Sequence, residues 1–137
     1  MKLRKQRQTI LVVDDDCAIS KLVKLFLELE GYTVLTADNA ESAMKLYSEP
    51  QAAVALLLTD VEMPNASGLE LADRVLQLEP QLKILFMSAL DGARRGFGCV
   101  TKPFTQAQLI GRVSEVLASH PDASSWSRLP NNSETRA

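Results

Sequence analysis

The chain has 137 residues, of which 46% are hydrophobic and 23% are charged, a composition typical of a single globular domain. Its formal net charge of -2 disfavours direct binding to nucleic acid, because no broad basic field is available to hold phosphates. The longest apolar stretch, residues 52–58, is too short to span a bilayer, and no hydrophobic signal-peptide segment opens the sequence. We therefore expect a cytoplasmic protein without membrane contact, in which the distant Cys17 and Cys99 are reduced thiols.

The first half of the chain alternates short apolar runs with stretches of helical periodicity. Ile19 and the apolar residues that follow it predict a helix that ends at Gly31, a typical C-terminal cap. Asn39 is the predicted N-cap of a second helix, which ends before Pro50. Three strands are expected around these helices, at residues 10–13, 32–37 and 53–59. The unbroken apolarity of the third run places it at the centre of a sheet.

The second half continues this alternation. A third helix is predicted by apolar residues at helical spacing from Leu69 and ends near Pro80. Thr105 and Gln108 form a capping-box pattern that opens a last helix. The predicted inward face of that helix consists of Leu109, Val113, Val116 and Leu117. The two remaining strands are expected at residues 83–87 and 98–101. Five strands alternating with helices predict an α/β fold, a doubly wound five-stranded parallel sheet.

This pattern occupies one domain, residues 9–119, with an extension at each end. Residues 1–8 form a basic N-terminal arm, which we expect to be solvated. Residues 120–137 turn to Pro, Ser, Asn and Asp, a composition that predicts a flexible tail or linker. The sequence leaves open whether the domain stands alone or was part of a longer protein.

Four apolar runs end in polar residues suited to handling a phosphate or a metal. These residues are Asp14 and Asp15, Asp60, Ser88, and Lys102. Because ligands bind beyond the carboxyl ends of parallel strands, we expect all of them in one crevice. Clustered carboxylates repel one another, so the arrangement indicates a hard cation such as Mg²⁺. A carboxylate there can attack a phosphoryl group, while the amine and the hydroxyl hold the phosphoryl oxygens.

The same residues resemble a known family. The matching motifs are Ile-Leu-Val-Val-Asp-Asp, Asp60 followed by Met63-Pro64 and Gly68, Ser88-Ala89, and Lys102-Pro103-Phe104. In this order they resemble the receiver domain of two-component response regulators, of the chemotaxis-regulator type, over residues 8–119. The resemblance implies a flavodoxin-like receiver fold and a signalling phospho-acceptor domain that catalyses only its own phosphorylation and dephosphorylation.

The resemblance also implies a metal site around the acceptor. Asp60 would be the phospho-acceptor and one of the Mg²⁺ ligands. Asp15 would bind Mg²⁺ directly, Asp14 largely through water, and Glu62 through its backbone carbonyl.

Further residues would hold the phosphoryl group once it is on the acceptor. By the same resemblance, Lys102 and Ser88 would bind its oxygens, and small Ala89 would leave room beside it. The phosphoryl donor would be a phosphohistidine on a sensor histidine kinase or a histidine phosphotransfer protein. The signal would pass on by contact with a downstream protein that the sequence does not identify.

Two departures from the family concern the output face. Cys99 occupies the switch position, three residues before Lys102, where an aromatic residue is usual, and Phe97 lies on the same strand face. Only residues 89–97 separate the fourth and fifth strands, whereas a crossover that contains a helix takes about ten to twelve residues. We therefore expect the fourth helix to be truncated or missing, and the domain to remain a monomer.

Three alternatives stay open from the sequence alone. Asp16 extends the acidic pair, so the metal ligands could be displaced by one residue. The chain could be a receiver-like binding module that works without phosphorylation. It could also be a phosphatase of the haloacid-dehalogenase type, with Asp14 and Asp16 as nucleophile and acid, although Ala18 and the scarcity of later acidic residues argue against that alternative.

Overall fold

The computed structural model describes residues 8–63, 67–89 and 96–119. Within these residues the chain forms a five-stranded sheet in the order β2-β1-β3-β4-β5, and every strand pair is parallel. The strands are β1 (Thr9–Val13), β2 (Thr33–Ala37), β3 (Val54–Asp60), β4 (Lys83–Ser88) and β5 (Gly98–Thr101). The predicted doubly wound parallel sheet, with β3 at its centre, is confirmed.

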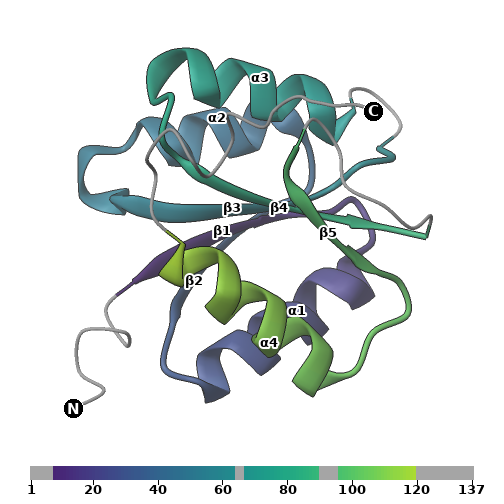
Figure 1. Ribbon diagram of the computed structural model, residues 1–137. Coiled ribbons are helices and arrows are strands. Elements are labelled where there is room, and N and C mark those ends of the chain that lie inside the picture. Colours follow the sequence, from purple (N-terminus) through teal and green to yellow (C-terminus); the bar gives the residue numbers. More distant parts are fainter. Residues whose placement is uncertain (1–7, 64–66, 90–95, 120–137) are drawn as a thin grey trace.

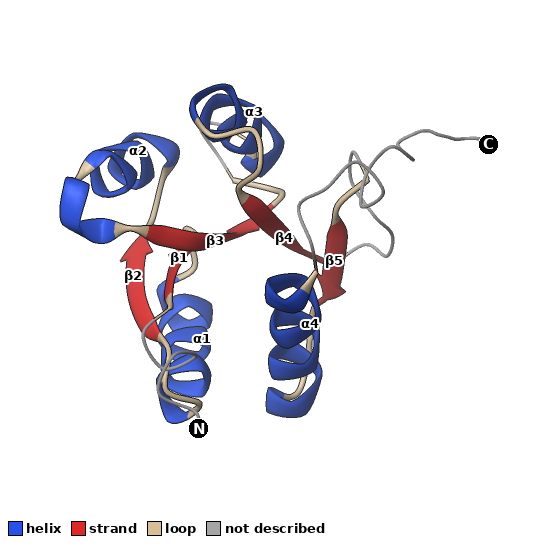
Figure 2. Ribbon diagram, turned by 60° about the vertical axis from the view of Figure 1, so that its left-hand side comes forward, coloured by secondary structure: helices blue, strands red, loops and turns tan. Residues whose placement is uncertain are grey.

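Helices cover both faces of this sheet. The described α-helices are α1 (Cys17–Leu29), α2 (Ala40–Ser48), α3 (Gly68–Leu78) and α4 (Gln106–Ala118), and a short 3-10 helix, η2, spans Pro50–Ala52. Figure 1 shows α2 and α3 on one face of the sheet and α1 and α4 on the other. Figure 2 shows the same layers, with β2 and β5 at opposite edges of the sheet. None of the helices in the described part of the chain is long and apolar enough to cross a membrane.

The helix ends follow the local sequence. The Asn39 side chain accepts a hydrogen bond from the Ser42 backbone N–H at 2.8 Å and caps α2, as predicted. Thr105 and Gln108 form the predicted capping box at the start of α4. Gly31 follows α1 with a φ of 100°, a backbone conformation that favours glycine.

Two apolar clusters fill the space between the sheet and its helices. On the face of α2 and α3, Leu57 and Phe86 are fully buried, and on the face of α1 and α4, Leu58 and Leu109 are fully buried. Since each buried leucine or phenylalanine stabilises the fold by about 1.5–3 kcal/mol, these clusters supply most of the favourable free energy of folding. Successive residues of β3 point into opposite clusters, which explains why this strand has no polar alternation.

The structure corrects the expected start of β3. Ala53 was predicted as its first residue, but the strand begins at Val54, and Ala53 has a φ of 46° in the left-handed region. The cause is the 3-10 helix Pro50–Ala52, because Ala53 forms its C-cap and the strand can begin only at the next residue. The strand also extends further than expected and includes Asp60 as its last residue.

Part of the prediction falls outside the described residues. Helix α4 follows β5 and is therefore the predicted last helix, not the one expected to be truncated. The shortened segment between β4 and β5 includes residues 90–95, which lie outside the described ranges, so its lack of a full helix stays a prediction. The same holds for the basic arm, of which only Gln8 is described, and for the tail at 120–137.

Candidate functional site

The candidate site lies at the edge of the sheet where the parallel strands end. Asp14 follows β1 directly, Asp60 and Ser88 are the last residues of β3 and β4, and Lys102 follows β5. Because all strands run in one direction, their carboxyl ends meet at a single edge. The structure thus brings together the polar residues that the sequence placed at the strand ends.

Three carboxylates form what we call the acidic group: Asp14, Asp15 and Asp60. One oxygen of each side chain lies within 4.8 Å of the others. Asp14 and Asp60 are buried, with 1% and 5% of their surface exposed, whereas Asp15 is exposed. Convergent carboxylate oxygens with one side open to solvent match the ligands that a hard cation such as Mg²⁺ prefers.

Asp16 does not belong to this group. Its side chain caps α1 by accepting hydrogen bonds from the backbone N–H groups of Ala18 at 2.9 Å and Ile19 at 3.4 Å. The Asp16 backbone N–H in turn donates to Asp14 Oδ1 at 2.9 Å, which fixes the orientation of that carboxylate. Asp16 thus serves as the N-cap of α1 and is not among the three carboxylates that converge, which argues against displacing the predicted ligand set by one residue.

Lys102 is the cation that faces the acidic group. Its Nζ donates to Asp14 Oδ2 at 2.9 Å and lies 3.4 Å from Asp60 Oδ2. Burial by itself lowers the pKa of Lys102, but the hydrogen bond to Asp14 and the attraction of both carboxylates outweigh it, so the pKa is raised. The ammonium is thus held in its charged form between two buried carboxylates.

The Asp60 carboxyl has a pKa above its usual range. Burial is the main cause and the negative charge of Asp14 adds to it, although the Lys102 ammonium and the Glu62 backbone N–H lower the pKa. For a carboxylate that is poorly solvated and repelled by a neighbouring charge, protonation or the binding of a cation is favoured. Raised pKa values that arise from burial and a nearby like charge are common at functional sites, so Asp60 is a candidate for such a role.

Ser88 lies beside the acidic group and is fully buried. Its Oγ donates to Glu62 Oε2 at 3.2 Å, and its carbonyl accepts from the Lys102 backbone N–H at 2.8 Å. The next residue, Ala89, is exposed and presents only a methyl group. The bond between Ser88 and Glu62 was not expected, because no periodic pattern signals a contact between residues so distant along the chain.

Gly68 allows the start of α3 to lie directly against the end of β3. A Cβ atom at this position would lie 2.0 Å from the backbone oxygen of Asp60, so any side chain would force the two segments apart. The Gly68 backbone N–H donates to the Val61 carbonyl at 2.9 Å and holds α3 in this position. A glycine is therefore needed here for close approach rather than for an unusual φ.

Cys99 on β5, the predicted switch position, packs on the face of the sheet that α2 and α3 cover. Phe97 and Cys99 both contact that apolar cluster, whereas Val100 points to the opposite face. The Phe97 ring meets Phe86 edge to face, with centroids 6.4 Å apart. The aromatic ring that Cys99 lacks is thus present on the same strand face two residues earlier, as the alternation predicted.

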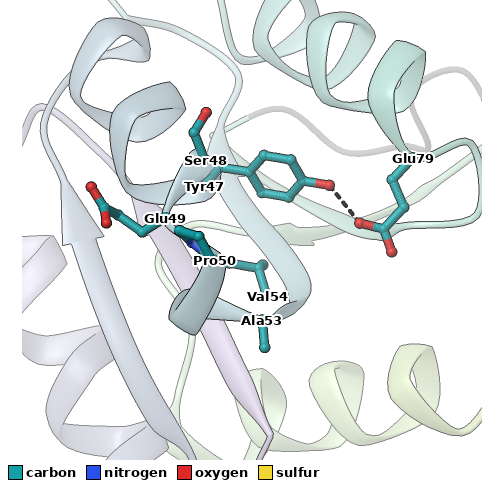
Figure 3. A pocket seen from close by; sticks show the side chains of 7 residues that line it. All are labelled: Tyr47, Ser48, Glu49, Pro50, Ala53, Val54 and Glu79. Carbon is teal, nitrogen blue, oxygen red and sulfur yellow. Dashed lines mark hydrogen bonds between the residues drawn. The ribbon is translucent and has the colours of Figure 1, made fainter.

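A surface hollow of about 440 Å³ lies at the other end of the sheet. Its lining includes Val54, the first residue of β3, and residues from the carboxyl ends of α2 and α3, and Figure 3 shows Tyr47 donating a hydrogen bond to Glu79 across it. Burial, with help from Glu79, raises the pKa of Tyr47 to about 12. This hollow contains none of the predicted site residues.

Comparison with known proteins identifies the family. A sequence model described as "Response regulator receiver domain" matches residues 10–114. The chain belongs to the response regulator receiver domain family. Membership in this family removes the support for a haloacid-dehalogenase phosphatase, and the cap that Asp16 forms on α1 leaves that alternative without its second carboxylate.

Relatives include both short and long proteins. The chain is 34% identical over 117 residues to the response regulator receiver protein CpdR of Brucella abortus, covering 79% of this chain and 95% of that protein. It is 36% identical over 120 residues to the DNA-binding transcriptional regulator NtrC of Azospirillum brasilense, covering 82% of this chain. This receiver domain spans only 24% of that regulator.

Solved structures share the fold. The response regulator protein TrrA of Thermotoga maritima, in complex with Mg²⁺ and BeF, has a TM-score of 0.70 and 33% identity, covering 80% of this chain and 99% of that one. The non-phosphorylated HemR receiver domain of Leptospira biflexa has a TM-score of 0.74 and 30% identity, covering 83% and 97%. This receiver domain therefore has the family's fold together with an acidic pocket of the kind that suits a phospho-acceptor.

Proposed function

We propose that this receiver domain accepts a phosphoryl group on Asp60 from the phosphohistidine of a sensor histidine kinase or a histidine phosphotransfer protein. The observation that supports this most strongly is the acidic group with Lys102 beside it, at the carboxyl edge of a receiver-type sheet. Family membership supports the same class of donor. The output of the domain would be a phosphorylation-dependent contact with a further protein.

The step that we propose is an in-line transfer. A carboxylate oxygen of Asp60 attacks phosphorus, the new oxygen–phosphorus bond forms, and the nitrogen–phosphorus bond of the donor histidine breaks. The imidazole leaves with the bonding electron pair, and the product on Asp60 is an acyl phosphate. Lys102 Nζ and Ser88 Oγ would donate to the phosphoryl oxygens, and the small side chain of Ala89 would leave them room.

The ligands of Mg²⁺ would be the carboxylates of Asp14, Asp15 and Asp60 and the backbone carbonyl of Glu62. Bound there, Mg²⁺ would neutralise part of the negative charge on the phosphoryl oxygens. TrrA, a receiver similar to this one, was solved in complex with Mg²⁺ and BeF, which supports the assignment. Asp14 would then share its carboxylate between the metal and Lys102.

Phosphorylation by a small donor tests the acceptor. We expect acetyl phosphate with Mg²⁺ to add one phosphoryl group, seen by intact mass spectrometry as an adduct that is labile in base. Asp60→Asn should abolish the adduct, and the matched Asp73→Asn change, at an exposed position on α3, should leave it in place. Equal labelling of Asp60→Asn would refute the acceptor assignment, and absence of any adduct would favour the module that works without phosphorylation.

The donor would dock on α1. This helix begins beside the acidic group, and three of its leucines, Leu22, Leu25 and Leu29, are 40%, 52% and 65% exposed along one side. Their spacing of three and four residues places them on a single stripe. An exposed apolar stripe next to a reactive site suits a helical partner that must bring its phosphohistidine to Asp60.

A charge in the stripe tests this docking site. Leu25→Asp should slow transfer from a phosphorylated phosphotransfer protein at least tenfold, since a carboxylate would have to be buried against the partner. Labelling by acetyl phosphate should not change. Leu78→Asp on α3, where the leucine is 63% exposed, is the matched control. Equal slowing in both variants would show that the partner does not recognise α1.

A further inference from the structure

The side chain of Glu62 reaches into the candidate site from the loop after β3. Ser88 Oγ donates to Glu62 Oε2 at 3.2 Å, and the Glu62 backbone N–H donates to Asp60 Oδ1 at 3.4 Å. Ser88 is fully buried, whereas Glu62 is exposed. An exposed carboxylate therefore lies between the acceptor aspartate and the buried hydroxyl.

The position of this carboxylate is unfavourable by charge. Asp14, Asp15 and Asp60 already form an acidic group, and a further negative charge nearby adds repulsion. No salt bridge to a described residue offsets the Glu62 charge. The hydrogen bond from Ser88 is the described contact that favours this placement of the side chain.

The same hydroxyl is needed by the phosphoryl group. A serine hydroxyl has one hydrogen to donate, so Ser88 Oγ cannot donate to Glu62 and to a phosphoryl oxygen at once. A phosphoryl group on Asp60 would also bring roughly two negative charges next to the Glu62 carboxylate. The Glu62 carboxylate and the phosphoryl group would thus compete for the same hydrogen bond from Ser88 Oγ.

We propose that Glu62 is a built-in competitor for the phosphoryl group, an inference that rests on the proposed function. In the unphosphorylated domain its carboxylate occupies Ser88 Oγ, and it must swing out when Asp60 is phosphorylated. The two positions of Glu62 form a two-state element at the mouth of the site, in a chain whose switch position is a cysteine. Competition weakens phosphoryl binding and couples it to movement of the Glu62 side chain.

Beryllofluoride binding in the presence of Mg²⁺ tests the competition. We expect Glu62→Ala to raise the affinity about tenfold over the wild-type protein, and Glu62→Gln to raise it less, because glutamine keeps an acceptor oxygen for Ser88 but loses the charge. Glu70→Ala, which removes an exposed glutamate from the first turn of α3, should leave the affinity unchanged.

A double-variant cycle isolates the shared hydroxyl. Ser88→Ala should weaken beryllofluoride binding, and in that background Glu62→Ala should have much less effect than in the wild-type protein. Binding of Mg²⁺ alone, measured by thermal melts, is a second readout. Loss of the Glu62 charge should weaken it or leave it unchanged, because a cation is attracted by the same charge that repels the phosphoryl analogue.

The outcomes separate this inference from the proposed function. If beryllofluoride binds the wild-type protein and Glu62→Ala with equal affinity, or if the Glu62→Ala effect persists fully in Ser88→Ala, the competition is refuted while the acceptor site stands. If beryllofluoride binds none of the variants and acetyl phosphate leaves no adduct, the proposed function itself has failed.

Discussion

At the carboxyl edge of the sheet, Asp14 and Asp60 are buried and both lie beside Lys102, whereas at the amino edge Tyr47 and Glu79 meet across an open hollow. Both places contain ionisable groups joined by hydrogen bonds. In the first, the hydrogen bonds link charges that are cut off from water. In the second, Glu79 is exposed, so its carboxylate is solvated by water in addition to accepting the hydrogen bond from Tyr47.

The difference shows that the carboxyl edge of the sheet, where the ionisable groups are buried, is the less favourable of the two edges for folding stability. Burying two carboxylates and an ammonium costs desolvation free energy that attraction only partly returns, so such a group is weak evidence for a stabilising role. The hollow carries no comparable desolvation cost, because the carboxylates that line it, Glu49 and Glu79, stay exposed to water. Variants that act on the two edges should therefore differ in size and sometimes in sign.

The largest effect is expected from Lys102→Met. Removing the ammonium leaves two buried carboxylates without a described cation, and we expect a loss of about 3 kcal/mol in the free energy of unfolding, measured by urea denaturation. Added Mg²⁺ should recover part of the loss. The control Lys24→Met removes an exposed ion pair with Glu28 and should change stability by less than about 0.5 kcal/mol. Equal losses in the two variants would contradict the comparison.

Gly68→Ala should have the next largest effect. A Cβ atom 2.0 Å from the Asp60 carbonyl oxygen forces the backbone beside the acceptor to move, and we expect a loss of about 2 kcal/mol. Gly111→Ala on α4 adds the same methyl group where no atom lies within 4 Å. It should stabilise the protein by about 0.5–1 kcal/mol, because alanine has the higher helix propensity. Thermal melts of the two variants should therefore shift in opposite directions.

The fold was predictable where a local pattern carries the information. Unbroken apolarity placed β3 at the sheet centre, and the Thr105 and Gln108 pair marked the start of α4. The strand beginning at Val54 was misplaced by one residue, since nothing in the apolar run shows that Ala53 adopts a left-handed conformation. Boundaries depend on such turns, and their geometry is set by packing rather than by propensity.

The site was predictable as a set of residues but not as a set of contacts. Parallel strands bring Asp14, Asp60 and Lys102 to one edge in any doubly wound sheet, so their proximity follows from topology. The capping role of Asp16 and the bond between Ser88 and Glu62 depend on rotamers and loop paths, which a sequence pattern does not encode.

Asp60→Asn should stabilise the domain. The raised pKa of Asp60, caused mainly by burial, means that the folded state binds its proton more tightly than the unfolded state does. The wild-type protein therefore loses stability as pH rises through the folded pKa, and the variant does not. At pH 7 we expect a gain of about 1 kcal/mol, or about 2–6 °C in Tm. The gain should shrink near pH 4, and a Tm below wild type at pH 7 would show that attraction to Lys102 dominates.

Tyr47→Phe, at the amino edge, should have the smallest effect. The hydrogen bond to Glu79 lies in an open hollow, so water replaces it readily, and between pH 6 and 9 we expect a change within about 0.5 kcal/mol. The sign at high pH follows from the pKa of Tyr47, which burial and Glu79 raise to about 12 from the ordinary 10.0. Since the folded state retains the phenolic proton longer than the unfolded state, the stability that it contributes is present below pH 10 and disappears as pH rises toward 12. Urea midpoints of wild type and variant should therefore agree at pH 8, and the wild-type midpoint should fall below that of the variant as the pH rises from 10 to 12. A loss at pH 8 as large as that in Lys102→Met would mean that the hollow, too, holds a buried ionisable group, and the contrast between the two edges would fail.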